Sequence, residues 1–308
     1  MGQNRPMKEN FAFLKQRVVD TLNQTDLHKK MKKIKGSTIC VGSGGSNVVA
    51  SFAALILNAN NHCPVKVSEP RDVLYESLKN YKNLFICSYS GNNHGVNILK
   101  NLKIKKYLLT YGENDDFNIL KCHSSIEKEK SFISLGATLM PMSVLLSCYY
   151  KDYLSFINHC FKVEKKRFFI KNIDLDFEVL SGIDTLTPER FIESTFTESG
   201  LSNVIVHKKY DFCHGRSTLS YKNKKNLIYL IANQKELDSV LLNELKHQYD
   251  SVVILKSDYK DLVLANYDLT LQAMYLSKYL AKKKKIDLSI VDYNKPLCKK
   301  LYKYKGEM

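Results

Sequence analysis

Two short segments combine glycines with hydroxyl side chains, and each directly follows an apolar run typical of a buried strand. GSGGS at residues 42–46 follows TICV, and SYSGNN at residues 88–93 follows LFIC. In a parallel α/β sheet such loops lead into helix N-termini, where unpaired N–H groups and the positive end of the helix dipole bind anions. Glycine lets the backbone approach a ligand closely, and serine hydroxyls donate hydrogen bonds. Together the two loops predict one shared phosphate site.

Two other interpretations of these loops are less favoured. Either loop alone also fits an ordinary turn with a helix N-cap, because Ser, Asn and Gly are the usual residues there. The presence of two such loops at strand ends of the same half favours the anion site. A dinucleotide site is not indicated, because GSGGSN lacks the Gly-x-Gly-x-x-Gly spacing and only Glu69 weakly matches the acidic partner. No Walker lysine follows either loop.

The sequence GGS at residues 44–46, followed by SYSG at residues 88–91, is similar to the sugar isomerase (SIS) domain family. The resemblance covers most of residues 36–305 and implies that the two loops hold the phosphate of a phosphosugar. The implied phosphate-binding residues are Ser43, Gly45, Ser46, Ser88, Ser90, Gly91 and Asn93. The family usually has threonine at position 93, where the Asn93 amide can still donate, and often a hydroxyl at position 45, where Gly45 offers its backbone N–H. The second half has no comparable loop, so we expect one phosphate site per chain.

The second half carries RFIESTFTESGLSNVIVHKKYDFCHGRSTL, residues 190–219, which contains acid–base groups. Aldose–ketose chemistry needs one group that opens the sugar ring and a carboxylate that moves a proton between C1 and C2 through an enediol. Histidine suits the first task because it titrates near neutrality, and a buried glutamate with a raised pKa suits the second. This segment resembles the isomerase half of glucosamine-6-phosphate synthase and the fructosamine-6-phosphate deglycases. By that resemblance Glu198 is the enolisation base and His214, sixteen residues later in a His-Gly loop, opens the ring.

The resemblance also implies a homodimer with shared active sites, because in that family the histidine usually comes from the neighbouring subunit. It further implies a lysine near the C-terminus that forms a Schiff base or grips the opened sugar, and Lys299 with Lys300 beside it is the closest match. Other interpretations stay open. Glu198 is also compatible with a surface glutamate, Glu193 is an alternative site residue, and His214 is compatible with a structural loop histidine.

The alternation of strand-like and helix-like segments predicts how these residues are positioned. We expect an α/β fold of two doubly wound parallel-sheet domains in tandem, SIS-type and flavodoxin-like, with residues 1–160 and 161–308 as the two domains. A charged linker is expected at residues 162–177. Strands are predicted at residues 38–41, 65–67, 84–87, 107–110, 204–212, 227–232 and 251–255, with strand character again from 286. Helices are predicted at residues 7–30, 46–57, 72–80, 93–102, 135–157, 191–199, 236–248 and 264–281.

Composition limits the class of protein. The net charge of +16 suits a nucleic-acid binder, but the lysines recur in pairs along the whole chain and no nucleic-acid-binding signature accompanies them. We therefore favour a lysine-rich solvated surface, whose field also favours a small anionic substrate. Most of the eight cysteines lie in apolar runs without Cys-x-x-Cys spacing, which indicates small hydrophobic residues in a reducing, cytoplasmic compartment. The longest apolar stretch, residues 133–150, is too polar for a membrane span.

These observations together predict a cytoplasmic, homodimeric phosphosugar isomerase, or a related deglycase or deaminase of an amino-sugar phosphate. The expected reaction is a proton transfer through an enediol without metal or cofactor. The ligand would be a small phosphosugar, with no membrane or nucleic-acid partner. Two alternatives are a sensor that binds a phosphosugar without converting it and a basic protein associated with nucleic acid.

Overall fold

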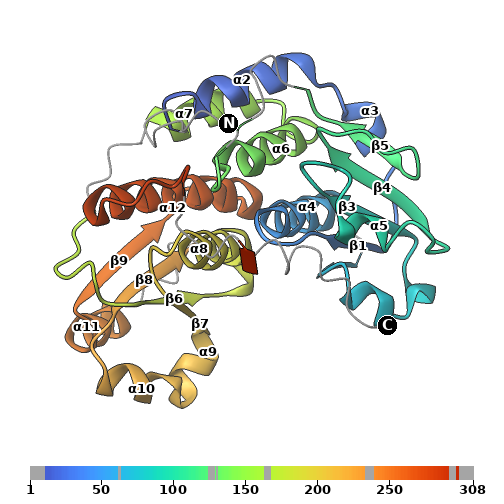
Figure 1. Ribbon diagram of the computed structural model, residues 1–308. Coiled ribbons are helices and arrows are strands. Elements are labelled where there is room, and N and C mark those ends of the chain that lie inside the picture. Colours follow the sequence, from blue (N-terminus) through green and yellow to red (C-terminus); the bar gives the residue numbers. More distant parts are fainter. Residues whose placement is uncertain are drawn as a thin grey trace.

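The computed structural model describes residues 11–61, 64–123, 129, 131–162, 168–232, 239–290 and 296–297. Its framework is two parallel β-sheets with helices on their faces (Figure 1). The first sheet has the strand order β2-β1-β3-β4-β5 and the second β7-β6-β8-β9. The order of the first sheet is that of flavodoxin-like doubly wound folds, and the second repeats its first four positions. The predicted α/β class with parallel sheets is confirmed.

The strands are short and mostly apolar on both faces, as expected for parallel sheets covered by helices on either side. All strand pairs are parallel. The strands of the first sheet are β1 Thr38–Val41, β2 Val65–Ser68, β3 Asn83–Cys87, β4 Lys105–Thr110 and β5 Asn118–Lys121. Those of the second sheet are β6 Phe177–Ser181, β7 Val204–Lys208, β8 Asn226–Ile231 and β9 Ser251–Lys256.

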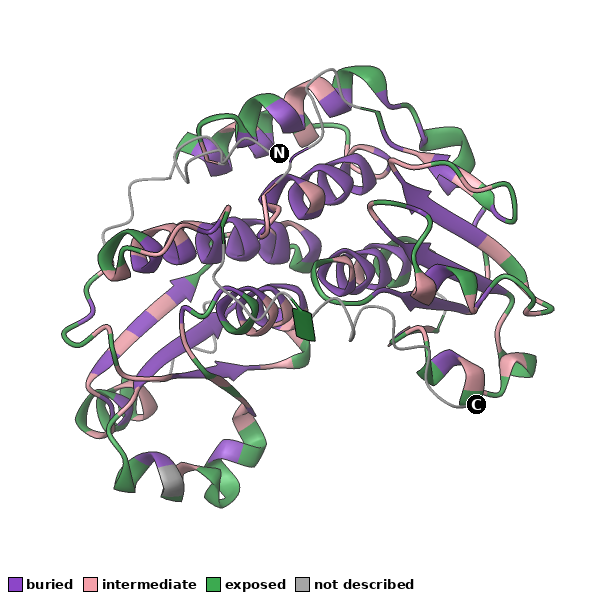
Figure 2. Ribbon diagram, viewed as in Figure 1, coloured by how far each residue is buried: buried purple, intermediate pink, exposed green. Residues whose placement is uncertain are grey.

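Long helices fill the space between the sheets and short ones cover the outer faces. The helices are α2 Leu14–Gln24, α3 His28–Met31, α4 Gly45–Asn61, α5 His94–Asn97, α6 Leu135–Ser147, α7 Tyr153–Lys162, α8 Leu186–Glu198, α9 Lys209–Asp211, α10 Ser217–Lys222, α11 Ser239–Gln248 and α12 Leu262–Lys284. Short 3₁₀ turns lie at Asp72–Tyr75, Leu78–Asn80 and Ile183–Thr185, and a π-type turn at Phe212–Arg216. Helices α4, α6, α8 and α12 lie between the sheets and are largely buried (Figure 2).

One hydrophobic cluster runs through this middle layer and joins the two halves. Alternate residues of the strands point into it, for example Phe85 of β3 and Phe177 of β6. Tyr267 of α12 lies at its centre with no exposed surface. Its ring contacts Phe52 and Phe156 at centroid distances of 6.2 and 5.5 Å, and its hydroxyl is 2.7 Å from a serine hydroxyl of α6. The division into domains at residue 160 stays a prediction, since these contacts tie both halves to one core.

Several elements differ from the predicted ones. The helix expected at 72–80 is two 3₁₀ turns, because Ser77 between them is extended with ψ of 93°. The helix expected at 93–102 ends after a single turn, and the one expected at 135–157 is two helices separated near residue 150. The strand expected at 204–212 ends at Lys208, and residues 286–290 form turns instead of a strand.

Two strands were missed in the sequence. Strand β6 begins at the last residue of the predicted linker, and Glu178, its second residue, interrupts the apolar pattern that would have indicated a strand. Strand β5 is short and contains two polar residues. In both strands, the polar residues make the apolar content too low to predict a strand.

The cysteines largely match their predicted role as small hydrophobic residues. Five of them are buried free thiols: Cys40, Cys87, Cys122, Cys148 and Cys160. Cys213 is exposed and departs from the prediction, and Cys63 and Cys298 lie outside the described residues. Within the described part of the chain, no helix is both long and apolar enough to cross a bilayer.

We expect Tyr267→Ala to lower the free energy of unfolding by about 3–5 kcal/mol, because it opens a cavity in the shared core. Chemical denaturation followed by circular dichroism should keep one transition that moves as a whole. Tyr221→Ala is the control, because Tyr221 is 82% exposed and its loss should change stability by no more than about 0.5 kcal/mol. Two separate transitions, only one of them shifted, would contradict a core shared by both halves.

Candidate functional site

The first predicted loop is a tight turn between β1 and the 17-residue helix α4. It is closed by hydrogen bonds from the N–H of Ser46 to the carbonyl of Ser43 (3.1 Å) and from the N–H of Asn47 to the carbonyl of Gly44 (2.9 Å). Gly44 has a φ of 52°, a conformation that favours glycine. Ser43, Gly44 and Gly45 are exposed and Ser46 is half-buried. The start of a long helix is therefore open to an anion here.

The second predicted loop is held together by its own side chains. The buried Ser88 hydroxyl accepts hydrogen bonds from the Gly91 N–H and the Asn93 amide, both at 3.2 Å. Asn93 also caps α5, because its Oδ1 accepts from the Val96 N–H at 2.9 Å. The Ser88 hydroxyl still has its own proton to donate, and Ser90 is exposed. Since α5 has only four residues, any anion binding here rests on the hydroxyls and N–H groups of the loop and not on a helix dipole.

The two loops leave the same edge of the first sheet side by side. Strands β1 and β3 are direct parallel neighbours, with Val41 opposite Ile86, so both chains enter their loops at the same level. The second loop is braced by the next strand, since a Cβ on Gly91 would collide with the Thr110 hydroxyl. The Asn114 amide also donates to the Gly91 carbonyl at 2.8 Å. The two loops are thus neighbours in space.

Glu198, the last residue of α8, lies against the first loop of the same chain. A Cβ built on Gly44 would stand 3.3 Å from the Glu198 Oε1. Ser194 donates to that oxygen at 2.6 Å, which leaves the other carboxylate oxygen for a ligand. Both residues border a cavity of about 280 Å³ between α4 and α8. It is lined by Gly44, Asn47, Glu69, Arg190, Glu193, Ser194, Thr197 and Glu198.

The alternative site residue Glu193 also lines this cavity, where it pairs with Arg190 at 3.4 Å. The two glutamates are therefore both near the first loop. Asn47 and Glu69 were missed as lining residues; Glu69 was noted only as a weak match to a dinucleotide motif. The sequence position of Glu69 could have indicated its role, because Glu69 directly follows β2 at the edge where parallel sheets bind ligands.

His214 does not line this cavity. It sits in the turn Phe212–Arg216, beside Gly215 with φ of 117°, and is exposed. Helices α9 and α10, which flank the turn, lie on the side of the second sheet away from the first sheet (Figure 1). His214 is not among the residues that line the cavity beside Glu198. One chain alone does not bring the two predicted acid–base groups together there.

A buried carboxylate holds the segment that carries His214. Glu178 of β6 has no exposed surface and accepts hydrogen bonds from Ser220 of α10 and from the Tyr249 hydroxyl (2.6 Å), with His207 Nε2 3.2 Å away. Burial raises the pKa of Glu178, but the hydrogen bonds from His207, Ser220 and Tyr249 outweigh it and lower the pKa to about 2. Glu178 thereby ties α10 to the sheet. It was missed in the sequence because a lone glutamate in an apolar run gives no catalytic pattern.

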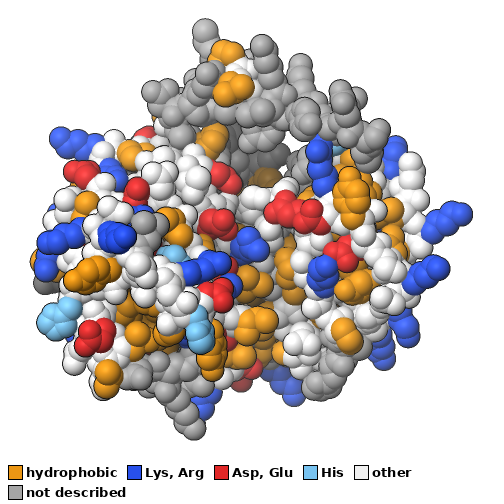
Figure 3. Space-filling view, turned by 90° about the horizontal axis from the view of Figure 1, so that it is seen from below, with side chains coloured by type: hydrophobic (Ala, Val, Ile, Leu, Met, Phe, Trp, Pro, Cys, Tyr) orange, Lys and Arg blue, Asp and Glu red, His pale blue; other side chains and the backbone are white. Residues whose placement is uncertain are grey.

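Lys299 and Lys300 lie outside the described residues. On the face drawn in Figure 3, Lys and Arg side chains are scattered, many of them at the left and right margins, with Asp and Glu among them toward the middle. That face shows no continuous basic stripe.

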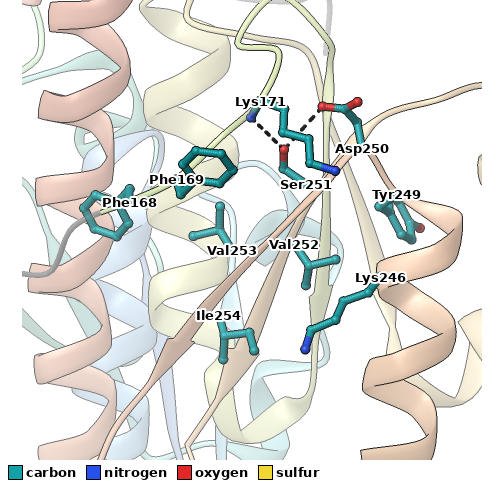
Figure 4. Close-up of a pocket in the computed structure, with 10 residues that line it drawn as sticks. All are labelled: Phe168, Phe169, Lys171, Lys246, Tyr249, Asp250, Ser251, Val252, Val253 and Ile254. Atoms are coloured by element: carbon teal, nitrogen blue, oxygen red, sulfur yellow. Dashed lines mark hydrogen bonds between the residues drawn. The ribbon is translucent and has the colours of Figure 1, made fainter.

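A second cavity, of about 570 Å³, is lined by none of the predicted residues. It runs along the edge strand β9 and is lined by the consecutive residues Ser251–Ile254 together with Phe168 and Phe169 (Figure 4). Ser251 accepts a hydrogen bond from the Lys171 N–H at 2.9 Å at one end. Among the residues that the structure describes, this groove brings no acid–base groups toward the loops.

We expect Glu178→Gln to change how stability depends on pH. A carboxylate with a lower pKa in the folded than in the unfolded protein stabilises the fold above about pH 4.3, and this contribution is lost as the pH falls toward the folded-state pKa. For Glu178 that window runs down to about pH 2. Denaturation measured across it should show a shallower decline in Glu178→Gln than in the unchanged protein. Glu113→Gln, at a side chain 80% exposed, is the control and should keep the decline; curves that stay parallel for Glu178→Gln would contradict the assignment.

Comparison with protein-family models and with curated proteins found no match. Among solved structures, the C-terminal domain of glucosamine-fructose-6-phosphate aminotransferase from Francisella tularensis is similar, with a TM-score of 0.66 and 13% identity over 94% of this chain and 98% of that one. Glucosamine-6-phosphate deaminase from Thermotoga maritima gives 0.68 and 15% over 93% and 96%. Tagatose-6-phosphate ketose/aldose isomerase from Escherichia coli gives 0.67 and 13% over 94% and 97%. At these identities the likeness is one of fold, and it extends over nearly the whole chain.

Proposed function

We propose that this chain binds a phosphosugar where β1 and β3 end and that Glu198 moves a proton on the bound sugar. The observation that supports this most directly is the approach of Glu198 to Gly44, since it joins a carboxylate from one half to the anion-binding loop of the other. The structural neighbours support the same class of ligand, because their names describe enzymes of sugar phosphates.

The phosphate would lie on the two loops. Ser43, Gly45 and Ser46 open the first turn of α4, and Ser90 is exposed on the neighbouring loop. These groups bind an anion by oriented N–H and O–H donors, which give more specific geometry than mobile surface lysines do. The basic surface would raise the local concentration of such a ligand.

In the described part of the second sheet, the ends of β6 and β7 are unsuited to a phosphate, which supports one site per chain. There Ser181 and Lys208 both donate to the buried Glu189 carboxylate. The position is already occupied by an internal anion and its counter-ion. A second phosphate would meet like charge.

The proposed reaction is a proton transfer between adjacent carbons. The Glu198 oxygen that Ser194 does not hold would take a proton from the carbon next to the carbonyl, giving an enediol or enolamine, and return it to the neighbouring carbon. Isomerisation follows directly, and deglycation or deamination follows if an amine leaves instead. Lys299 stays a proposed further contact to the opened sugar.

Ring opening would come from His214 of a second copy of the chain. Its exposure makes it available to a neighbour, and the resemblance to the synthase and deglycase enzymes implies a shared site in a homodimer. A binding-only sensor is the second candidate function. It is favoured by one observation, namely that a single chain does not bring His214 to the cavity beside Glu198.

Mixing two inactive variants tests the shared site. We expect Glu198→Gln and His214→Asn each to abolish turnover of the hexose 6-phosphate that binds best in a thermal-shift screen. When the two are unfolded and refolded together, about half of the dimers are mixed and each has one intact site, so about a quarter of the activity should return. Recovery of no activity from the mixture would contradict a shared site. No turnover of any hexose 6-phosphate by the unchanged protein, with binding retained in both variants, would favour the sensor.

Gly44→Ala tests the contact between loop and base. Both Gly44 and Gly200 have a positive φ, of 52° and 69°, so alanine at either should cost about 1 kcal/mol of stability. Only at Gly44 would the added methyl press on the Glu198 carboxylate, because nothing lies within 4 Å of the Cβ position at Gly200. We therefore expect kcat to fall about tenfold or more in Gly44→Ala through misplacement of the base, and to stay unchanged in the control Gly200→Ala. Equal kcat values in the two variants would contradict the proposed role of the contact.

A further inference from the structure

The second sheet ends one strand earlier than the first among the residues that the structure describes. In the first sheet, β5 pairs with β4 and covers its outer edge. Strand β9 holds the place of β4 in the second sheet, but the described residues after it lead into α12 and not into a fifth strand. The only described strand that pairs with β9 is β8. The cavity of about 570 Å³ lies along this outer edge, between Lys246 of α11 and Phe168 (Figure 4).

Strand β9 lacks the features by which natural edge strands avoid pairing with another chain. Such edges are usually interrupted by a proline, a bulge or a charge within the strand. Strand β9 has the sequence SVVILK, pairs with β8 in an unbroken register, and carries its one charge at the last residue, Lys256. Beside it, Phe169 is 75% exposed and lines the same cavity as Val253 and Ile254. An apolar edge with an exposed aromatic ring next to it is suited to binding one more strand.

The sequence of β9 is complementary to itself when two copies run antiparallel. A two-fold axis pairs equivalent strands antiparallel and places one residue opposite its own copy. With Val253 at that position, Val252 of one copy lies opposite Ile254 of the other. Asp250, directly before β9, then lies opposite Lys256, once at each end of the ladder. Apolar pairs therefore occupy the middle and opposite charges the ends, and both kinds of cross-strand pair are stabilising.

The neighbouring registers lose this match. With the axis one residue earlier, Lys256 lies opposite Gln248. With the axis one residue later, Asp250 lies opposite Asp258, where like charges repel. A shift by one residue thus exchanges an attractive pair for a neutral or repulsive one. Charge therefore favours the register centred on Val253.

The same contact covers Phe169. Its neighbour Phe168 is anchored on α12, where the centroid of its ring lies 5.8 Å from that of Tyr279. Phe169 lines the cavity together with Val253, the residue at the axis (Figure 4). The Phe169 rings of both copies therefore come near the axis and are removed from water when the strands pair.

We infer that β9 is an interface between two copies of this chain. It pairs antiparallel with β9 of the second copy and joins their two four-stranded sheets into one continuous sheet. This inference does not rest on the proposed function, because neither Glu198 nor His214 lines the cavity along β9. A shared active site formed through His214 would use a second surface.

Charge reversal at the ends of β9 tests this pairing. The mass of the full chain is measured by sedimentation equilibrium at the lowest concentration at which the unchanged protein is fully assembled. Lys256→Glu and Asp250→Lys each place like charges opposite one another at both ends of the ladder. Each should halve the mass of the assembly, whether or not a second interface exists. The double variant Asp250→Lys/Lys256→Glu restores the opposite charges and should recover the full mass.

Recovery in the double variant separates this pairing from other occupants of the edge. A segment of the same chain, or a different protein, would not regain its contact when the two charges of β9 are exchanged. Phe169→Ser should also lower the mass, and Lys103→Glu, at an exposed position before β4, is the control that should keep it. Far-ultraviolet circular dichroism shows that each variant is folded.

Three results would overturn the inference. They are the mass of a single chain for the unchanged protein at every concentration, the full mass in both single variants, and no recovery in the double variant. Turnover of a sugar phosphate is not measured in this experiment, so the inference and the proposed function fail separately.

Discussion

The packing of α8 on α4 inside the shared core is the constraint on which the candidate site depends. Helix α8 buries Phe191, Ile192 and Phe196, and α4 buries Phe52 against the same cluster. Because Glu198 is the last residue of α8, its distance from the first loop is fixed by that contact. A carboxylate on a flexible loop would have no such fixed place relative to an anion-binding turn. The packing of the hydrophobic core therefore fixes where the loop and the backbone of Glu198 lie relative to one another.

Polar and charged groups are distributed unevenly around the candidate site. The loops at the ends of β1 and β3 offer N–H and O–H donors, while the cavity beside them is lined by three glutamates and Arg190. Where β6 and β7 end in the second sheet, Glu189 and Lys208 form an ion pair. Such local separation of charge is invisible in the net charge of the chain.

The outer face of the second sheet has a different organisation. Glu178 is fully buried there, and it is tolerated because Ser220 and Tyr249 donate hydrogen bonds to it and His207 Nε2 lies 3.2 Å away. Through Ser220 it fixes α10, and the adjoining turn displays His214 on the surface. A buried polar anchor beneath an exposed histidine fits a surface that works in contact with another molecule, which is how the proposed shared site uses it.

The sequence by itself determined the local features. Apolar β-branched runs such as Thr38–Val41 predicted strands, and glycines beside serines predicted the turns, because backbone conformation and burial are encoded by neighbouring residues. It did not reveal β6, where a buried Glu178 interrupts the apolar pattern. It also did not reveal that Glu69 and Asn47 line one cavity with Glu198, or that His214 does not. Glu198 is more than a hundred positions from Glu69 and Asn47 but only sixteen from His214. Only the packing of helices in a common core decides which of these side chains meet.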